Sequence, residues 1–168
     1  FVLEAKRLVL GYDTPLTTPV DIRVERGRKI AIRGTNGLGK STLLKTLLGM
    51  QPPVSGTVER GDFVSVGYFE QESPAGSQNT ALEEFWQAYP GRSNFEVRAA
   101  LAACGLTNEH ITTKMLALSG GEAARVRLAK IIEQPVNLLV LDEPTNHLDV
   151  ETKKELQRAL HEYKGTLL

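Results

Sequence analysis

The stretch Leu118-Ser119-Gly120-Gly121-Glu122 decides the fold of this chain, because of the motifs on either side of it. Upstream stands Gly34-Thr35-Asn36-Gly37-Leu38-Gly39-Lys40-Ser41, which fits G-x-x-x-x-G-K-S/T, the pattern of a loop that wraps a triphosphate. Downstream, the apolar run 138–141 ends in the adjacent acids Asp142 and Glu143. The loop alone indicates a nucleotide. The glycine loop and the apolar strand that ends in acids predict an α/β fold.

The glycine-rich loop has the residues that a triphosphate requires. Glycines tolerate the tight turn, so backbone N–H groups can point inward, and the positive end of the following helix adds to the attraction. Lys40 is expected to bridge the β- and γ-phosphates, and the Ser41 hydroxyl to bind Mg²⁺. A strand predicted at 29–33 and a helix at 41–48 disfavour the alternative, a glycine-rich turn with a chance lysine. The predicted phosphate-binding residues are Gly34, Thr35, Asn36, Gly37, Leu38, Gly39, Lys40, Ser41 and Thr42.

The two acids follow a strand that is predicted to be buried. Adjacent carboxylates in such a place are costly unless they bind a cation or take part in acid–base chemistry. Asp142 is expected to hold Mg²⁺, directly or through water, and Glu143 to orient or deprotonate an attacking water. The alternative is a solvated strand end without a chemical role.

Composition indicates a soluble domain with a core of its own. The chain has 168 residues, of which 41% are apolar and 24% charged, values that are ordinary for a globular protein. The 20 Lys and Arg balance the 20 Asp and Glu, so bulk charge does not favour nucleic acid as a partner. The sequence has no membrane span, which needs about 18 consecutive apolar residues, and no signal-peptide pattern.

The single cysteine and the chain ends suggest where the protein resides and how complete it is. One cysteine, Cys104, excludes an intramolecular disulfide and fits a reducing compartment, so we expect a cytoplasmic protein. Its small apolar neighbours indicate a core position without chemistry. Because the chain starts at Phe1 and residues 166–168 resemble the start of a buried strand, we expect a piece of a longer polypeptide, incomplete at its C-terminal end.

Between the phosphate loop and the stretch 118–122, the spacing of apolar residues changes from that of a strand to that of a helix. Residues 63–69 are predicted to form a strand, and residues 72–117 an inserted helical subdomain. The spacings Thr80-x-x-Glu83 and Ser93-x-x-Glu96 fit capping boxes, in which each side chain bonds the other residue's backbone N–H. The aromatic residues Phe85 and Trp86 are expected to serve packing rather than ligand contacts.

Ser119-x-x-Glu122 is another capping box, so Ser119 is expected to begin a helix. The Ser119 hydroxyl and the amides of Gly120 and Gly121 would then form a second anion site at a helix N-terminus. One chain does not need two such sites for one γ-phosphate, whereas a head-to-tail pair does. The sequence therefore predicts that two such domains close around the nucleotide.

These motifs resemble those of the ABC-type ATPases, whose signature is most often written LSGGQ where this chain has Glu122. The resemblance covers nearly all of residues 1–168 and implies a single ATP-binding domain. The implied fold is a P-loop NTPase core with a mostly parallel sheet, an N-terminal antiparallel β region and the inserted helical subdomain. The implied activity is hydrolysis of ATP, with ATP and Mg²⁺ as cofactors and a second cassette as partner. The signature Ser119-Gly120-Gly121-Glu122 would bind the partner's nucleotide, and this chain alone is expected to be weakly active.

The resemblance assigns three further residues. Tyr12 matches the aromatic residue that stacks on adenine, although an exposed turn tyrosine is the alternative. Gln71 matches the glutamine that contacts Mg²⁺ and the attacking water, and would count with Glu143 and Lys40 among the catalytic residues; a polar loop residue is the alternative. Asp149 matches the D-loop, which crosses the interface between cassettes, and it also fits a helix cap.

The stretch Glu143-Pro144-Thr145-Asn146-His147-Leu148-Asp149 indicates a branch of this family. Transporter ATPases commonly read S-A-L-D where this chain has N-H-L-D, a form that resembles the ABC-F group. Members of that group carry two cassettes in one chain, have no membrane domains and act on the ribosome, as regulators of translation or in protection from antibiotics. Because no long arm interrupts the helical block, we expect the second cassette.

Other interpretations remain open at this stage. The family's switch histidine follows a strand that this sequence only begins, so His147 is interpreted as a loop or interface residue. One alternative function is the ATPase subunit of a membrane transporter, which the rest of the gene would distinguish. A second is a nucleotide-gated binding module with little turnover.

Overall fold

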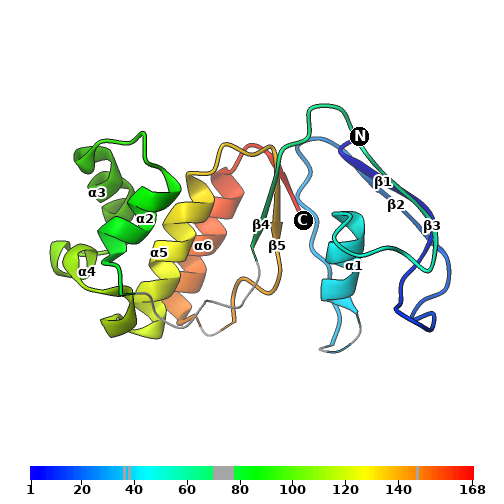
Figure 1. Cartoon of the computed structure of the whole chain (residues 1–168), viewed down its shortest axis with the longest axis horizontal. Helices are drawn as coiled ribbons and strands as arrows, with labels where there is room; N and C mark the ends of the chain where they lie inside the picture. The colour runs from blue at the N-terminus through cyan, green and yellow to red at the C-terminus, as the bar shows by residue number, and fades with distance from the viewer. Residues whose placement is uncertain (36, 38, 70–77, 147) are drawn as a thin grey trace. The chain divides into compact units, whose positions relative to one another are not determined.

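The computed structural model describes residues 1–35, 37, 39–69, 78–146 and 148–168. The chain divides into two compact units, and each is considered by itself (Figure 1). The β-rich unit comprises Phe1–Phe69, Pro135–Asp142 and Lys164–Leu168. The helical unit comprises Glu70–Gln134 and Glu143–Tyr163.

The N-terminal part of the β-rich unit is an antiparallel sheet, as expected. Strands β1 (Leu3–Val9), β2 (Val20–Val24) and β3 (Ser55–Arg60) pair in the order β2-β1-β3. The register of β1 shifts at Arg7, whose φ of 49° lies in the left-handed region. A Cβ on Gly56 would lie 2.4 Å from the Arg7 carbonyl oxygen, so only glycine allows β3 to pass this irregularity.

The second sheet of this unit is parallel, and Asp142 follows its central strand. Strands β4 (Val66–Phe69), β5 (Leu138–Leu141) and β6 (Thr166–Leu167) pair in the order β4-β5-β6. All residues of β5 are buried, as in a sheet covered on both faces. The predicted strand 63–69 begins only at Val66, because Phe63 adopts a φ of 59°.

The predicted strand 29–33, which leads into the phosphate loop, pairs only at its beginning. Lys29 forms a parallel bridge with Leu167, and the Ile30 N–H donates to the Leu167 carbonyl oxygen at 2.9 Å. The last pair of the neighbouring β5–β6 ladder is Leu139 with Leu167, and residues 31–33 form no regular strand. The structure thus corrects the predicted strand to a single bridge beside β6.

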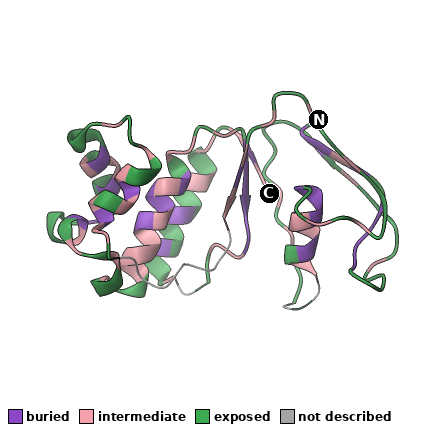
Figure 2. Cartoon of the chain, in the orientation of Figure 1, coloured by how far each residue is buried: buried purple, intermediate pink, exposed green. Residues whose placement is uncertain are grey.

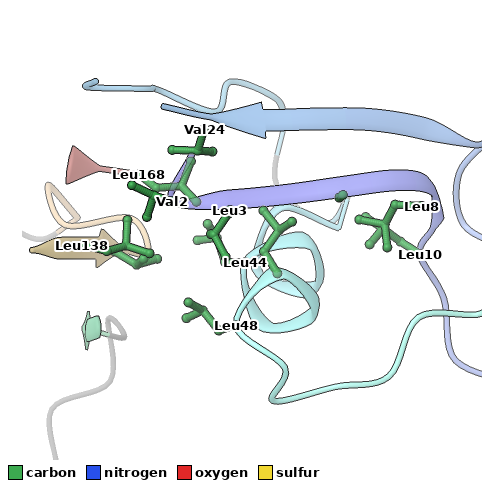
Figure 3. Packing of buried hydrophobic residues seen from close by; sticks show 12 residues of the cluster. Val2, Leu3, Leu8, Leu10, Val24, Leu44, Leu48, Leu138 and Leu168 are labelled. Atoms are coloured by element: carbon green, nitrogen blue, oxygen red, sulfur yellow. The ribbon is translucent and has the colours of Figure 1, made fainter. Parts of the chain in front are cut away.

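Helix α1 (Lys40–Leu47) is held against β1 by leucines. Leu44 and Leu48 belong to one buried cluster together with residues of β1, β5 and the chain end, and Figure 3 shows Leu44 next to Leu3. The helix stops where Gly49 takes a φ of 73°, with its N–H bonded to the Thr46 carbonyl oxygen at 3.1 Å. This apolar packing fixes the start of α1, and therefore the end of the phosphate loop.

The helical unit contains the remaining helices of the described chain. Figure 2 shows that buried residues line the inner sides of these helices, while exposed residues cover the outer sides. None of the described helices has the length and apolar character that crossing a membrane requires. The elements are α2 (Ala81–Ala88), α3 (Asn94–Ala103), α4 (Asn108–Thr112), the 3₁₀ turn η1 (Met115–Ala117), α5 (Gly120–Ile132) and α6 (Val150–Glu162).

Side chains cap every α-helix that this unit shows. The boxes predicted at Thr80 and Ser93 are both present, since each side chain accepts the N–H of a glutamate whose carboxylate accepts the N–H of the cap residue. Ser119 caps α5 in the same way, and Asp149 caps α6 by accepting the Thr152 N–H at 2.7 Å. A further box at Thr107, which begins α4, was not predicted.

The core of the helical unit is built around Phe85, which is fully buried. Its ring centroid lies 5.0 Å from that of Tyr89, and Trp86 packs against the same cluster. The prediction that Phe85 and Trp86 serve packing is therefore confirmed. Helices α2 and α3 contact α5, and α5 contacts α6, so the helices of the predicted subdomain 72–117 share one unit with the two later helices. Residues 72–77 lie outside the described chain, and the subdomain boundary stays a prediction.

Cys104 follows α3 and is buried, as predicted. Burial raises the pKa of its thiol to about 11. Its carbonyl oxygen accepts a hydrogen bond from the Arg125 guanidinium at 3.2 Å, and Arg125 also pairs with Glu155 at 2.9 Å. Cys104 is therefore part of the packed core and has a poorly ionised thiol.

Replacing Phe85 with alanine should destabilise the helical unit strongly. The loss of a fully buried phenylalanine, with the cavity that it leaves, is expected to lower the free energy of unfolding by about 3–5 kcal/mol. Urea unfolding followed by circular dichroism measures this change. The matched control is Phe95→Ala, because Phe95 exposes 80% of its surface, and its effect should stay within about 0.5 kcal/mol. Equal effects of the two variants would contradict the described core.

Candidate functional site

The phosphate loop is described at most of its predicted positions, while Asn36 and Leu38 lie outside the described residues. Gly37 and Gly39 both have a φ of 83°, a conformation that favours glycine. Apart from the adjacent loop residues, no atom of the described residues lies within 4 Å of the position that a Cβ would take on either glycine. The Lys40 ammonium donates to the Gly34 carbonyl oxygen at 2.7 Å.

Helix α1 begins differently from the helices of the other unit. Its cap residue is Gly39, which makes no side-chain cap hydrogen bond. In the described chain every other α-helix has a side-chain cap. Because N–H groups at a helix start need an acceptor, the beginning of α1 fits an anionic ligand. Ser41 is exposed there, and Thr42 is buried.

Asp142 is held in place as the continuation of β5. Its N–H donates to the Phe69 carbonyl oxygen at 3.0 Å, and its carboxylate lies 3.5 Å from the Tyr68 hydroxyl, which donates to it. The residue is only 9% exposed. Sequence reasoning did not identify Tyr68, because a tyrosine in a strand carries no signal of a polar contact.

Glu143 has a backbone conformation that sets it apart. Its φ of 49° lies in the left-handed region, which costs a residue other than glycine about 1–3 kcal/mol and recurs at functional sites. The Asn146 side-chain amide donates to its carboxylate, and the Asn146 N–H donates to its carbonyl oxygen at 3.2 Å. This turn presents Glu143 with one carboxylate oxygen already engaged. The sequence places Asn146 in the motif 143–149 but did not predict its hydrogen bonds to Glu143.

The residues present suit Mg²⁺ held together with phosphates. In the described part of the chain no group of three or more His, Cys, Asp or Glu residues could form a metal cage. Mg²⁺ is commonly held by one or two protein oxygens plus substrate phosphates and water. The Ser41 hydroxyl and the Asp142 carboxylate, both in the β-rich unit, supply ligands of this kind. Gln71, the third predicted ligand, lies outside the described residues, as does His147.

The signature residues form the beginning of α5. The Ser119 hydroxyl oxygen accepts the Glu122 N–H at 3.2 Å, and Glu122 Oε2 accepts the Ser119 N–H at 2.8 Å. This backbone donor holds the pKa of the Glu122 carboxyl below its ordinary value. The other oxygen of Glu122 lies 3.2 Å from Nε2 of His110, a contact that the sequence did not predict.

Two further predicted residues differ in their surroundings. Tyr12 exposes 70% of its surface, which suits a stacking residue and equally an exposed turn tyrosine. Asp149 lies next to the signature: its Oδ2 is 3.5 Å from the position that a Cβ would take on Gly121. Asp149 therefore lies close to the signature within one chain, and it also forms the predicted helix cap.

A sequence model of the ABC transporter family matches residues 17–146, which contain the phosphate loop, the signature and both acids. The chain belongs to this family. One relative of the cassette is the uncharacterized ABC transporter ATP-binding protein YfmM of Bacillus subtilis, which is 56% identical over 99% of this chain and 32% of YfmM. Another is ABC transporter F family member 2 of Arabidopsis thaliana, which is 40% identical over 99% of this chain and 25% of that protein.

The cassette spans only 32% and 25% of the length of these two relatives. A solved structure from Pyrococcus furiosus, assigned as an ABC transporter ATP-binding protein, matches it with a TM-score of 0.84 over 99% of the cassette and 90% of that chain. At 23% identity this match shows the fold alone. The predicted fold class is confirmed, and the chain is an ATP-binding cassette.

Replacing Lys40 with alanine should abolish stabilisation of the cassette by ATP. A ligand that binds only the folded state raises the melting temperature, and the loss of the lysine removes the main cation expected to face the phosphates. Thermal melting with and without Mg²⁺ and ATP measures the shift. Lys45→Ala is the control, since it removes the same charge from the last turn of α1 and should keep the shift. An unchanged shift in Lys40→Ala would place ATP elsewhere.

Proposed function

We propose that this cassette binds and hydrolyses ATP as one member of a pair, in which each phosphate loop faces the signature of the other member. The observation that carries this proposal is that one chain contains two helix starts suited to phosphate. One is the uncapped beginning of α1, and the other is the start of α5 with Ser119. A single γ-phosphate does not require both, so the second site fits a nucleotide held by a partner.

The proposed roles follow from the local geometry. The N–H groups of the loop and of the first turn of α1 bind the phosphates, and Lys40 leaves the Gly34 carbonyl to contact them. Ser41 and Asp142, with Gln71, would hold Mg²⁺, which when bound neutralises phosphate charge. Tyr12 is proposed to stack on the adenine.

Glu143 is proposed to accept the proton of the attacking water. A general base must be aimed at its proton, and two features fix this carboxylate: the left-handed backbone and the amide of Asn146. Asp142 is almost buried and held by Tyr68, whereas Glu143 is partly exposed and can reach a water. Asp142 would therefore bind the metal, and Glu143 would accept the proton.

The signature is proposed to complete the site of the partner. The Ser119 hydroxyl accepts the Glu122 N–H through its oxygen and keeps its own hydrogen available for donation to a phosphate. The amides of Gly120 and Gly121 lie in the first turn of α5, where backbone N–H groups face outward from the helix start. The partner is a second cassette of the same polypeptide, or a second copy of this one.

The parent protein is proposed to be a cytoplasmic, two-cassette protein of the ABC-F type that acts on the ribosome, with this chain as its second cassette. Two findings support this. The relative named ABC transporter F family member 2 matches across 99% of the chain. The sequence reads Asn146-His147-Leu148-Asp149 where transporter ATPases commonly read S-A-L-D.

Glu143→Gln should separate binding from hydrolysis. The amide cannot accept the proton of water, so turnover should fall roughly a hundred- to ten-thousand-fold, the usual contribution of a general base. ATP binding should persist and the closed pair should accumulate. Phosphate release measures turnover, and sedimentation measures pairing. Glu162→Gln, an exposed change at the end of α6, is the control. Normal turnover in Glu143→Gln would show that another group is the base.

Ser119→Arg should block pairing without weakening the binding of ATP to a single cassette. The large cation fills the place proposed for the partner's phosphate, while the phosphate loop is unaltered. Sedimentation of the Glu143→Gln background with Mg²⁺ and ATP measures pairing, and thermal shift at low protein concentration measures binding. Ser93→Arg is the matched control, because it breaks a capping box of the same kind on α3. If binding by a dilute single cassette is lost instead, the head-to-tail arrangement is wrong.

A further inference from the structure

His110 joins the beginnings of two helices in the helical unit. It occupies the third position of α4, where its Nδ1 accepts the Thr107 N–H at 3.2 Å and its own N–H donates to the Thr107 hydroxyl at 3.3 Å. A histidine here replaces the glutamate or glutamine that usually completes a capping box. The imidazole has a second nitrogen, and this nitrogen makes a contact outside α4.

The second nitrogen contacts the signature. Nε2 of His110 lies 3.2 Å from Oε1 of Glu122, whose Oε2 accepts the Ser119 N–H at 2.8 Å. One oxygen of this carboxylate therefore accepts a backbone hydrogen bond, and the other lies within reach of the ring nitrogen. The third-position residues of two capping boxes, one at α4 and one at α5, are linked through a single ring.

One form of the imidazole satisfies all of these contacts. Because Nδ1 accepts a hydrogen bond, the ring hydrogen of the neutral form resides on Nε2, where it can be donated to Glu122. A second hydrogen on Nδ1 would face the Thr107 N–H, donor against donor. The neutral Nε2–H form therefore fits the arrangement at both nitrogens.

The contact between His110 and Glu122 bears on the negative charge that this glutamate brings to the signature. The family most often has a neutral glutamine where this chain has Glu122, and a carboxylate one turn from a phosphate site repels the phosphate. The Ser119 N–H donates to one oxygen of Glu122, and Nε2 of His110 lies 3.2 Å from the other, a placement that would stabilise the carboxylate charge and hold its orientation. The histidine thus acts on the signature through the glutamate, without touching a nucleotide.

We propose that His110 is a positioning residue for the signature of this cassette. By holding Oε1 of Glu122, it keeps Oε2 on the Ser119 amide, and so sets the geometry in which the Ser119 hydroxyl and the following amides meet the γ-phosphate of a partner. The consequence for pairing rests on the proposed function. The effect on the Ser119 amide does not, because it concerns contacts within one unit.

Two substitutions of His110 distinguish the two nitrogens. In His110→Asn, the side-chain oxygen lies as many bonds from Cα as Nδ1 does, so the box with Thr107 can persist while the contact with Glu122 is lost. In His110→Gln, the longer amide reaches as far as Nε2 and can again donate to Glu122. If His110 only capped α4, both variants would have the same effect on the Ser119 amide.

Amide hydrogen exchange followed by NMR tests the positioning directly. In His110→Asn, the Ser119 amide should exchange about five- to tenfold faster, as expected when a charge-assisted hydrogen bond loses its support, and His110→Gln should restore most of the protection. The Ser93 amide, which bonds Glu96 in a box without histidine, is the internal control and should not change. Equal Ser119 protection in His110→Asn and the unaltered chain, or equal losses in both variants, would overturn the proposal.

Sedimentation of the same variants in the Glu143→Gln background with Mg²⁺ and ATP tests the consequence. Pairing should weaken in His110→Asn and recover in His110→Gln, while thermal shifts by ATP at the phosphate loop stay unchanged in both. Unimpaired pairing in His110→Asn would overturn the effect on the signature. If the unaltered background does not pair at all, the proposed function fails, and the exchange of Ser119 still decides whether His110 positions the signature.

Discussion

Backbone N–H groups at the start of a helix need an acceptor, and this requirement organises both units of the cassette. In the helical unit the chain supplies its own acceptors, from Thr80 to Asp149. In the β-rich unit α1 begins at Gly39, which has no side chain to offer. The leucines of α1 share a buried cluster with residues of β1, which helps to hold this start without a side-chain cap. At α5, the Ser119 oxygen that caps the helix also belongs to the signature, so in the proposed pair helix stability and partner recognition would depend on one atom.

The end of β5 shows how adjacent residues of one chemical type come to differ. Asp142 continues the hydrogen bonding of the strand, is almost buried and receives the Tyr68 hydroxyl. The next residue, Glu143, leaves the strand in a left-handed conformation and is held by Asn146. These different surroundings are consistent with the proposed division of roles, in which Asp142 would bind the metal and Glu143 would accept a proton.

Interactions between residues close in sequence could be predicted, and those between helices could not. The capping boxes at Thr80, Ser93 and Ser119 follow from residue types three positions apart, so their spacing was sufficient. The contact of His110 with Glu122 depends on how α4 packs near α5, which no local pattern encodes. The fold class followed from the order of the motifs. The strand predicted at 29–33 is reduced to a bridge at Lys29. A strand needs a neighbouring strand to pair with as well as an apolar pattern.

The buried thiol makes this cassette convenient for spectroscopy. Cys104 is the single cysteine of the sequence, and its raised pKa of about 11 keeps it protonated and shielded from maleimide reagents. Exposed positions such as Phe95 could therefore receive an engineered cysteine and a spin label or fluorophore without removal of the native one. Distances between two such probes would report whether their sites move relative to each other when nucleotide is added.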